Sequence, residues 1–175
     1  MLRDARPEDV PGILAIYAPF IRNTAYTFEY EVPTPAAFAE RFRAITARYP
    51  WLVWEEDGSI LGYAYGSEFQ PRAAFQWGAD LSIYLRPEAQ GRGIGRALYT
   101  ALEGRMAALG YCILYAAVTS ANEGSCRFHE ALGYSQVARF PKTGVKFGRW
   151  YDIIWYEKRV REGIPSEPPL LPGKE

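Results

Sequence analysis

Apolar residues recur along this chain first at helical spacing and then at strand spacing. Residues 9–22 place apolar side chains on one helical face. A second such pattern follows Thr34 and Pro35, which suit the N-cap and the first turn of a helix. Further on, short apolar runs predict strands and two longer periodic segments predict helices. The strands are expected at 51–55, 60–66, 78–85, 113–118, 134–140 and 147–157, and the helices at 94–109 and 122–132.

The order of these segments predicts a mixed α/β fold with a largely antiparallel sheet. It reads as strand, two helices, three strands, helix, strand, helix and two strands. Asp57 and Gly58 form a strong hairpin signal, and residues 142–144 are expected to join the last two strands. No internal repeat is visible, so we expect one domain over residues 1–160. A proline-rich tail at 161–175 is expected to be extended or disordered.

The composition suits one folded domain of 175 residues, of which 49% are hydrophobic. The 20 basic residues balance the 20 acidic ones, which argues against a general role at nucleic acids or membrane surfaces. Neither an apolar run of membrane-spanning length nor a signal-peptide core is present, so we expect a cytoplasmic protein. Cys112 and Cys126, with a single histidine, give no zinc-binding spacing, so we expect free thiols and no metal site.

A glycine-rich segment between an apolar strand and a long helix is the most informative local pattern. Gln90, Gly93 and Gly95 lie where the helix is expected to begin. Glycine lets an anion approach the unpaired backbone N–H groups there, at the positive end of the helix dipole. Such a turn suits a pyrophosphate. The segment lacks the third glycine of a dinucleotide fingerprint and the Lys of a P-loop. Taken alone, it leaves a flexible turn before an ordinary helix as the alternative.

The spacing Gln90-x-x-Gly93-x-Gly95 resembles the coenzyme A pyrophosphate loop of the GCN5-related N-acetyltransferases (GNAT). More narrowly, the chain resembles the phosphinothricin and methionine sulfone or sulfoximine acetyltransferases. The resemblance covers residues 2–157, outside the proline-rich tail. It implies the GNAT fold, a central, mostly antiparallel sheet of about seven strands flanked by about four helices. The matching segments are 49–53, 75–77, 82–85, 129–134 and 144–150.

The resemblance implies an acetyl-CoA-dependent N-acetyltransferase that acts on a small amino acid or analogue by direct attack in a ternary complex. An acyl-enzyme is not expected, because neither cysteine has a predicted His–Asp partner. Two alternatives stay open. One keeps the fold but acetylates another amine, such as a polyamine, an aminoglycoside or a protein N-terminus. The other is a non-catalytic acyl-CoA-binding regulatory module.

Asp80 and His129 are the candidate catalytic residues. A primary amine is mostly ammonium at neutral pH, and a carboxylate at Asp80 can bind it and accept its proton. The family usually carries Glu at this position. Because Asp is one methylene shorter, direct contact and a water relay both stay open. His129 stands where many family members carry Tyr, from which an acid can reach the coenzyme sulfur. The alternatives are an Asp that caps a turn and a histidine that hydrogen-bonds locally.

The resemblance also assigns residues to the two substrates. Arg72 and Phe75 are expected, with Asp80, to bind the acceptor. Arg72 would clamp an acidic group, although any one of 16 arginines can equally be a solvated loop residue. Asn122 is expected to hydrogen-bond the pantetheine arm, to cap its helix, or both. Residues expected to contact acetyl-CoA are Ile83, Tyr84, Leu85, Gln90, Gly91, Arg92, Gly93, Ile94, Gly95, Arg96, Asn122 and Ser125, with phosphate contact from at least one of the two arginines.

The expected partners are a small-molecule amine and a second copy of the chain, with no nucleic acid and no membrane. The final strands are rich in aromatic residues that offer more apolar surface than one small core needs, at Trp150, Tyr151, Trp155 and Tyr156. Similar family members also tend to dimerise, so we expect a homodimer.

Overall fold

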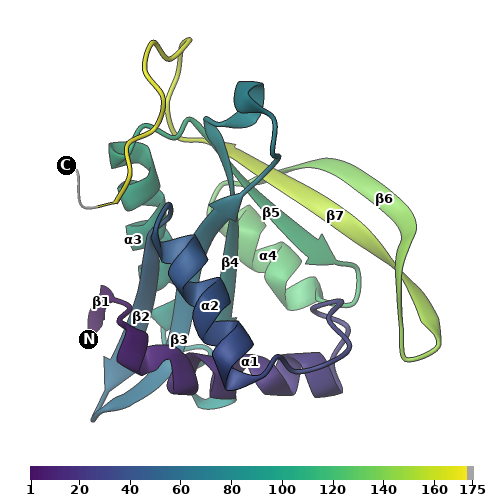
Figure 1. Ribbon diagram of the computed structural model, residues 1–175. Coiled ribbons are helices and arrows are strands. Elements are labelled where there is room, and N and C mark those ends of the chain that lie inside the picture. The colour runs from purple at the N-terminus through teal and green to yellow at the C-terminus, as the bar shows by residue number, and fades with distance from the viewer. Residues whose placement is uncertain (173–175) are drawn as a thin grey trace.

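In a computed structural model, which describes residues 1–172, seven strands form one sheet in the order β1-β2-β3-β4-β5-β7-β6 (Figure 1). The strands are β1 (Leu2–Asp4), β2 (Trp51–Glu56), β3 (Ser59–Glu68), β4 (Gly78–Leu85), β5 (Ile113–Thr119), β6 (Ser135–Lys146) and β7 (Arg149–Arg159). The helices are α1 (Val10–Asn23), α2 (Pro35–Thr46), α3 (Ile94–Ala108) and α4 (Glu123–Ala131). This arrangement confirms the predicted mixed α/β fold. It also confirms the N-cap of α2, where the Thr34 hydroxyl accepts a hydrogen bond from the Ala37 N–H at 3.2 Å.

The sheet opens between β4 and β5, the one parallel pair among its strands. These strands pair only where residues 78–80 lie opposite residues 113–115. Beyond Asp80, β4 continues along β3 as far as Leu85, while β5 continues along β7 as far as Thr119. Two neighbouring strands that each follow a different partner must separate, so Asp80 lies at the point where the sheet splits.

Two helix layers cover the two faces of the sheet (Figure 1). On one face α3 packs through Leu98 and Leu102 against a core that includes Leu81 of β4. On the other face α1 and α2 pack against Trp51 and Tyr63 of β2 and β3. Because side chains alternate along a strand, Leu81 faces α3, whereas Asp80, Ser82 and Tyr84 face α1 and α2. The ring of Tyr84 confirms this direction, since it lies 4.9 Å from the ring of Tyr17 in α1.

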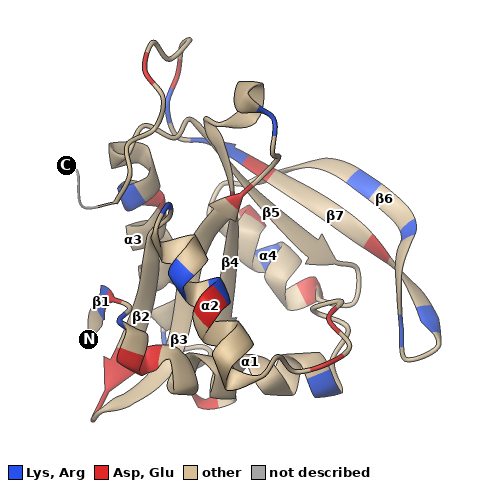
Figure 2. Ribbon diagram, viewed as in Figure 1, with Lys and Arg blue, Asp and Glu red and all other residues tan. Residues whose placement is uncertain are grey.

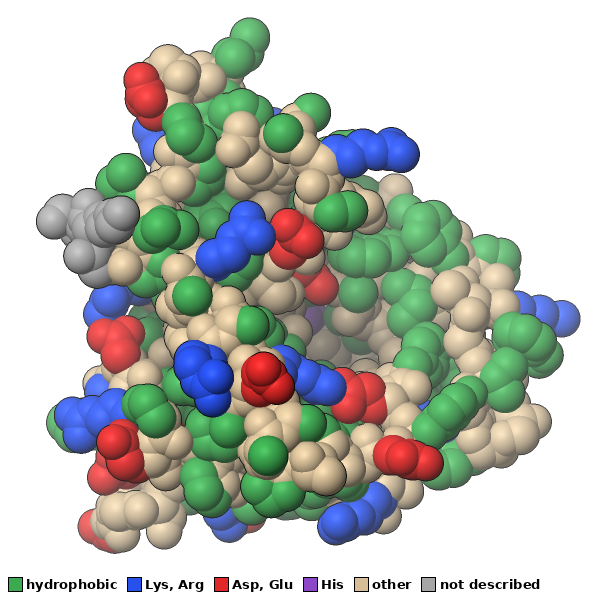
Figure 3. Space-filling view, viewed as in Figure 1, with side chains coloured by type: hydrophobic (Ala, Val, Ile, Leu, Met, Phe, Trp, Pro, Cys, Tyr) green, Lys and Arg blue, Asp and Glu red, His purple; other side chains and the backbone are tan. Residues whose placement is uncertain are grey.

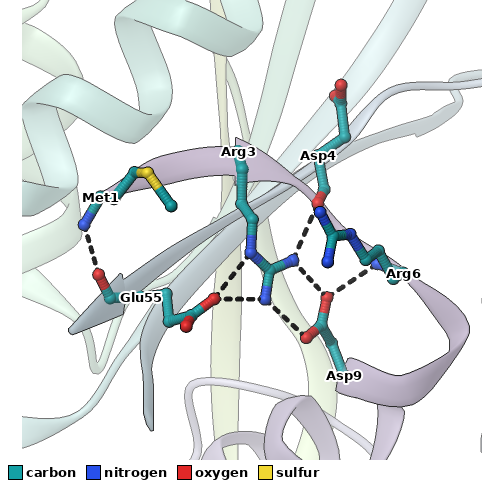
Figure 4. A network of polar contacts seen from close by, with 6 residues as sticks. All are labelled: Met1, Arg3, Asp4, Arg6, Asp9 and Glu55. Carbon is teal, nitrogen blue, oxygen red and sulfur yellow. Dashed lines mark hydrogen bonds and ion pairs between the residues drawn. The ribbon is translucent and has the colours of Figure 1, made fainter. Parts of the chain in front are cut away.

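An ion-pair network fastens β1 to β2 and to the start of α1 (Figure 4). The Arg3 guanidinium donates to both carboxylate oxygens of Asp9, at 2.7 and 2.8 Å, and to Glu55 at 2.7 Å. The Met1 ammonium donates to the Glu55 carbonyl. Arg3 holds the pKa of the Asp9 carboxyl below its ordinary value, chiefly through the hydrogen bonds between them. The short β1 strand is therefore anchored by charge as well as by its backbone pairing.

The turn of the last hairpin, between β6 and β7, lies further along the chain than the sequence predicts. The expected turn at 142–144 lies inside β6, where the pairing with β7 is irregular between Phe140 and Gly144. Asp152 accepts a hydrogen bond from the Lys142 N–H at 2.9 Å, which holds Lys142 at a φ of 50°. The true turn is Phe147 and Gly148, with φ values of 50° and 71°. Two positive φ values make a turn whose twist suits a two-residue hairpin, so the predicted turn residues form a bulge instead.

The proline-rich tail carries no helix or strand from residue 161 to 172, and its last residues, 173–175, lie outside the described part. It is nevertheless attached to the rest of the chain. The Leu170 N–H donates to the Leu109 carbonyl at 2.7 Å, and the Trp77 indole N–H donates to the Glu167 carbonyl at 3.0 Å. Among residues 1–172, no helix combines the length and the apolar character that a membrane crossing requires. Lys and Arg positions are interspersed with Asp and Glu positions along the ribbon in Figure 2, in keeping with the balanced charge.

Candidate active site

The opening between β4 and β5 leads into a groove of about 790 Å³. A narrower space of about 70 Å³ lies in the opening itself, between Leu81–Tyr84 and Ala116–Thr119. Asn122 and Ser125 line both the groove and the narrow space, so these two spaces adjoin each other. Along this opening the β4 main chain lacks the strand partner that β5 provides at 78–80. Its backbone groups can therefore hydrogen-bond an extended ligand that carries amides.

The glycine turn forms the wall of the groove at the start of α3. Gly93 is the N-cap with a φ of 80° and no side-chain cap, and Gly91 has a φ of 71°. A Cβ at either position would meet no atom within 4 Å, so the space beside both glycines is open. Gly95 instead lies close to β4, where a Cβ would come within 3.1 Å of Leu85 Cδ1. This turn presents uncapped N–H groups to the groove, which suits the pyrophosphate of acetyl-CoA.

Two residues expected to contact the cofactor point elsewhere. The guanidinium of Arg92 pairs with Glu56 of β2 at 2.8 Å, outside the residues that line the groove. The Ile94 side chain is buried in the α3 core, which leaves only its backbone at the turn. Arg96 does line the groove, and one of its N–H groups reaches the Ala131 carbonyl at 3.4 Å. Of the two arginines, Arg96 is therefore the one placed to meet a phosphate.

Asn122 fulfils one expected role directly and is placed for the other. Its side-chain oxygen accepts a hydrogen bond from the Ser125 N–H at 3.1 Å, which caps α4. The same residue lines the groove, along which the pantetheine arm is expected to lie. Ile83, Tyr84, Leu85, Gln90 and Ser125 also line the groove.

Asp80 is a buried carboxylate at the point where the strands part. Its Oδ1 is shielded from solvent and has no hydrogen-bond partner within residues 1–172. Burial raises the pKa of this carboxyl to about 7, although the backbone N–H groups of Ala117 and Leu81 act in the opposite direction. A carboxylate that titrates near neutral pH and keeps a free oxygen is suited to take a proton from a bound amine.

His129 is 3% exposed and lines the narrow space beside Ser125. Its Nδ1 lies 2.8 Å from the Ser125 carbonyl, which can only accept, so Nδ1 carries the proton. Nε2 therefore accepts from the Tyr99 hydroxyl at 2.9 Å. Burial lowers the pKa of the imidazole and favours this neutral form. Both ring nitrogens thus hydrogen-bond neighbouring residues, which is the local role given above as the alternative to proton transfer. The Ser125 hydroxyl lies 3.3 Å from Nδ1.

Arg72 and Phe75 lie apart from this cleft in the described chain. They line a separate cavity of about 300 Å³ together with Arg48, Glu68 and Leu170 of the tail. That cavity shares no lining residue with the groove or with the narrow space. Their role toward the acceptor therefore stays a prediction.

On the side of the sheet where the acceptor is expected, α2 and the β6–β7 hairpin make contacts that sequence reasoning did not single out. The molecule is hollowed between α2 and the β6–β7 ribbon, with apolar side chains along the ribbon (Figure 3). Arg41 of α2 pairs with Glu29 at 2.6 Å, and each side chain keeps about a third of its surface exposed. Lys146, 2% exposed, donates to the Thr27 carbonyl at 2.8 Å and so ties the α1–α2 loop to the hairpin.

Tyr65 and Ser82 were missed for a different reason. They lie directly opposite each other in β3 and β4, on the same face as Asp80. The alternation of each strand can be read from the sequence, but the register that brings the two hydroxyls together cannot.

The sequence matches the family described as Acetyltransferase (GNAT) domain over residues 2–155. It is 35% identical to the phosphinothricin N-acetyltransferase of Alcaligenes faecalis, over 95% of this chain and 86% of that protein. Identity with the L-methionine sulfoximine/L-methionine sulfone acetyltransferase of Pseudomonas aeruginosa is 36%, over 89% of this chain and 92% of that protein. The structure of a GNAT superfamily phosphinothricin acetyltransferase from Sinorhizobium meliloti, in complex with AcCoA, matches with a TM-score of 0.90 at 39% identity, over 96% of this chain and 92% of that one. These findings confirm the resemblance seen in the sequence.

Proposed function

This chain belongs to the GNAT family of acetyltransferases, and we propose that its acceptor is the primary amine of a small amino acid or amino-acid analogue. Acetyl-CoA is the acetyl donor. The observation that carries the proposal is the buried, unpartnered Oδ1 of Asp80, at the opening that leads into the groove. A free carboxylate oxygen at this place suits an ammonium group better than a neutral alcohol.

The chemistry follows from this placement. The ammonium binds beside Asp80 and gives up one proton to the carboxylate, directly or through water. The free amine then attacks the thioester carbon, the new C–N bond forms and the C–S bond breaks. The thiolate takes a proton from solvent or from a group at the cleft such as His129. No acyl-enzyme is required, because the amine attacks the thioester directly, and the free thiol of Cys112 is buried.

The choice of acceptor rests on two supports. Relatives named for phosphinothricin and for methionine sulfoximine or sulfone act on amino acids with an additional polar group. The hollow between α2 and the β6–β7 ribbon also has apolar side chains along the ribbon, and the Arg41–Glu29 pair joins α2 to the loop that precedes it. Arg72 remains our proposed clamp for an acidic group, with Phe75 as a wall of the same site.

We expect rapid thiol release with methionine sulfone, methionine sulfoximine or phosphinothricin, and slow release with spermidine or an aminoglycoside. Arg72→Gln should raise the KM for these amino acids about tenfold with kcat little changed, because it removes a charged hydrogen bond used in binding. Equal rates with the polyamine would contradict the proposed acceptor class. An unchanged KM in Arg72→Gln would leave Arg72 as a solvated loop residue.

We further propose a homodimer formed through the β6–β7 hairpin. Phe147 and Trp150 are 58% and 60% exposed at its tip, and Val137 and Phe140 add apolar surface along β6. One residue expected at this interface lies elsewhere, because Tyr156 is buried with its ring stacked 5.7 Å from the ring of His129. The interface is therefore expected at the end of the hairpin rather than along all of β7.

Light scattering at micromolar concentration should give about twice the 19.8 kDa mass of one chain. Phe147→Ser combined with Trp150→Ser should yield the single-chain mass. Ile164→Ser, which changes a residue 98% exposed in the tail, is the matched control and should leave the dimer intact. A single-chain mass for the parent protein would rule the dimer out.

The two cysteines are free, as expected for a reducing compartment, and we place the protein in the cytoplasm. Its expected partners remain the amine, acetyl-CoA and a second copy of the chain.

A further inference from the structure

Two hydroxyl groups stand next to Asp80 on the acceptor side of the sheet. Ser82 follows Asp80 by two positions in β4, and Tyr65 lies opposite Ser82 in β3. The alternation of side chains puts all three residues on the face that α1 and α2 cover. Ser82 also lines the narrow space at the opening of the sheet. Two hydroxyl side chains therefore share one face of the sheet with the buried carboxylate, and Ser82 links them to the narrow space.

Asp80 and Ser82 lie at a spacing along β4 that one water can bridge. Side chains two residues apart on one strand begin about 6.6 Å from each other. A carboxylate and a hydroxyl at such a spacing can both hydrogen-bond one water, at about 2.8 Å from each oxygen. The unpartnered Oδ1 of Asp80 supplies one acceptor for such a water.

Tyr65 lies opposite Ser82 on the neighbouring strand, β3. Burial raises the pKa of its hydroxyl, the Ser82 side chain lowers it as a hydrogen-bonding neighbour, and the Asp80 charge raises it. The ring is fixed by stacking on Trp51, with centroids 4.1 Å apart and planes at 13°. The hydroxyl of Tyr65 thus remains protonated and is held in place near both Ser82 and Asp80.

We propose that Ser82 and Tyr65 hold a water that carries the proton of the acceptor ammonium to Asp80. This inference rests on the proposed function, and it explains how an Asp can serve where the carboxylate is one methylene short of a Glu. The ammonium gives a proton to the water as the water gives one to Asp80, so the water is regenerated and the amine becomes neutral. Ser82 and Tyr65 are positioning residues, since they orient the water and are not themselves consumed.

The matching serine in β3 provides an internal control. Ser67 lies opposite Asp80 in the sheet, but its hydroxyl donates to the Asp80 main-chain carbonyl at 3.4 Å. Like Ser82, Ser67 is a serine close to Asp80, but its hydroxyl is directed at the backbone. Ser67→Ala should therefore leave proton transfer unaffected.

The test compares these substitutions in two backgrounds. With Asp80 present, Ser82→Ala and Tyr65→Phe should each lower kcat about tenfold, the effect of one hydrogen bond. Asp80→Glu should remain active, because the longer side chain reaches the amine without the water. In that background Ser82→Ala should lower kcat less than about twofold, as expected when the coupling between two residues is removed. Equal losses in both backgrounds, or a loss of activity in Asp80→Glu as large as in Asp80→Asn, would overturn the proposal.

A second measurement uses the protein without substrates. A carboxyl carbon NMR titration of Asp80 should give a higher pKa in Ser82→Ala and in Tyr65→Phe, because a water held by these hydroxyls stabilises the charged carboxylate. Ser67→Ala should leave the titration unchanged. An unchanged Asp80 titration in both hydroxyl variants would overturn the proposal. If the parent protein binds acetyl-CoA but acetylates none of the amines, the proposed function fails, and the titration still decides whether the two hydroxyls act on Asp80.

Discussion

Asp80→Asn should lower kcat by about 10²–10⁴-fold, the range typical of losing one positioned base, while the affinity for acetyl-CoA stays nearly unchanged. The amide keeps the shape of the carboxyl group, but it cannot take the ammonium proton. Asp80 ends the short parallel pairing of β4 and β5, and the glycine turn that is expected to hold the pyrophosphate lies beyond the end of β4. Steady-state kinetics together with a thermal shift in acetyl-CoA separate these two effects.

The pH profile of the parent protein provides the corresponding check. Because burial raises the pKa of Asp80 to about 7, kcat/KM should rise with pH through this region as the carboxyl loses its proton. In Asp80→Asn this rise of kcat/KM with pH, the ascending limb of the profile, should be altered. Asp152→Asn is the matched control, since Asp152 pairs with Arg139 on the hairpin at 2.6 Å and should not affect the limb. If Asp80→Asn turns over like the parent at every pH, the base is not Asp80 and the residue merely ends the strand pairing.

Asp80→Asn should also stabilise the ligand-free protein at pH values where Asp80 of the parent is charged. The Asp80 carboxyl has an ordinary pKa of 3.8 and a folded-state pKa raised by burial to about 7, so folding favours its neutral form. That contribution is fully present below about pH 3.8 and is lost as the pH rises through about 7. The neutral amide of Asp80→Asn avoids this loss, which amounts to at most about 4 kcal/mol. The ligand-free variant should therefore melt above the parent at pH 8, by more than it does at pH 4.

The local parts of the site could be predicted because their causes are local. The positive φ of Gly93 and the cap that Asn122 places on Ser125 depend on residues within three positions of each other. Outside the last hairpin, helix periods and strand alternation likewise placed the expected helices and strands to within a few residues. The glycine spacing, read with those elements, was enough to place the groove at the start of α3.

The remaining parts depend on contacts between distant segments. Arg92 turns away from the groove because Glu56, on another strand, is within reach of its guanidinium. The proton state of His129 depends on Tyr99, which α3 brings to within 2.9 Å of Nε2. The pKa of Asp80 depends on the exact place at which β4 and β5 separate, and strand register is not readable from one strand.

Turn chemistry was a misleading signal at the last hairpin. Residues 142–144 contain the residue types that favour turns, whereas the actual turn puts Phe147 at a φ of 50°, which is unfavourable for an aromatic side chain. Partners on both strands determine the outcome, since Asp152 holds Lys142 and the β6–β7 pairing resumes at Gly144. A Cβ at Gly144 would lie 2.1 Å from the ring of Phe28, so this position needs glycine for packing rather than for a turn.

Gly93→Val should abolish most of the thermal stabilisation that acetyl-CoA gives. For the parent, ligand at about 100 times its Kd should add about 2.7 kcal/mol, or about 5–10 °C in Tm for a chain of this size. A valine at a φ of 80° would place its side chain in the open space where the pyrophosphate is expected, and would strain the N-cap of α3.

A control with the same backbone conformation separates the effect of the side-chain volume at Gly93 from the effect of the backbone strain. Gly133 has a φ of 87°, has open space around it and does not line the groove. Gly133→Val should therefore lower the Tm of the free protein by a similar amount but keep the shift with acetyl-CoA. A full shift in Gly93→Val would remove the glycine turn from the acetyl-CoA site, because no pyrophosphate could share that space with the side chain.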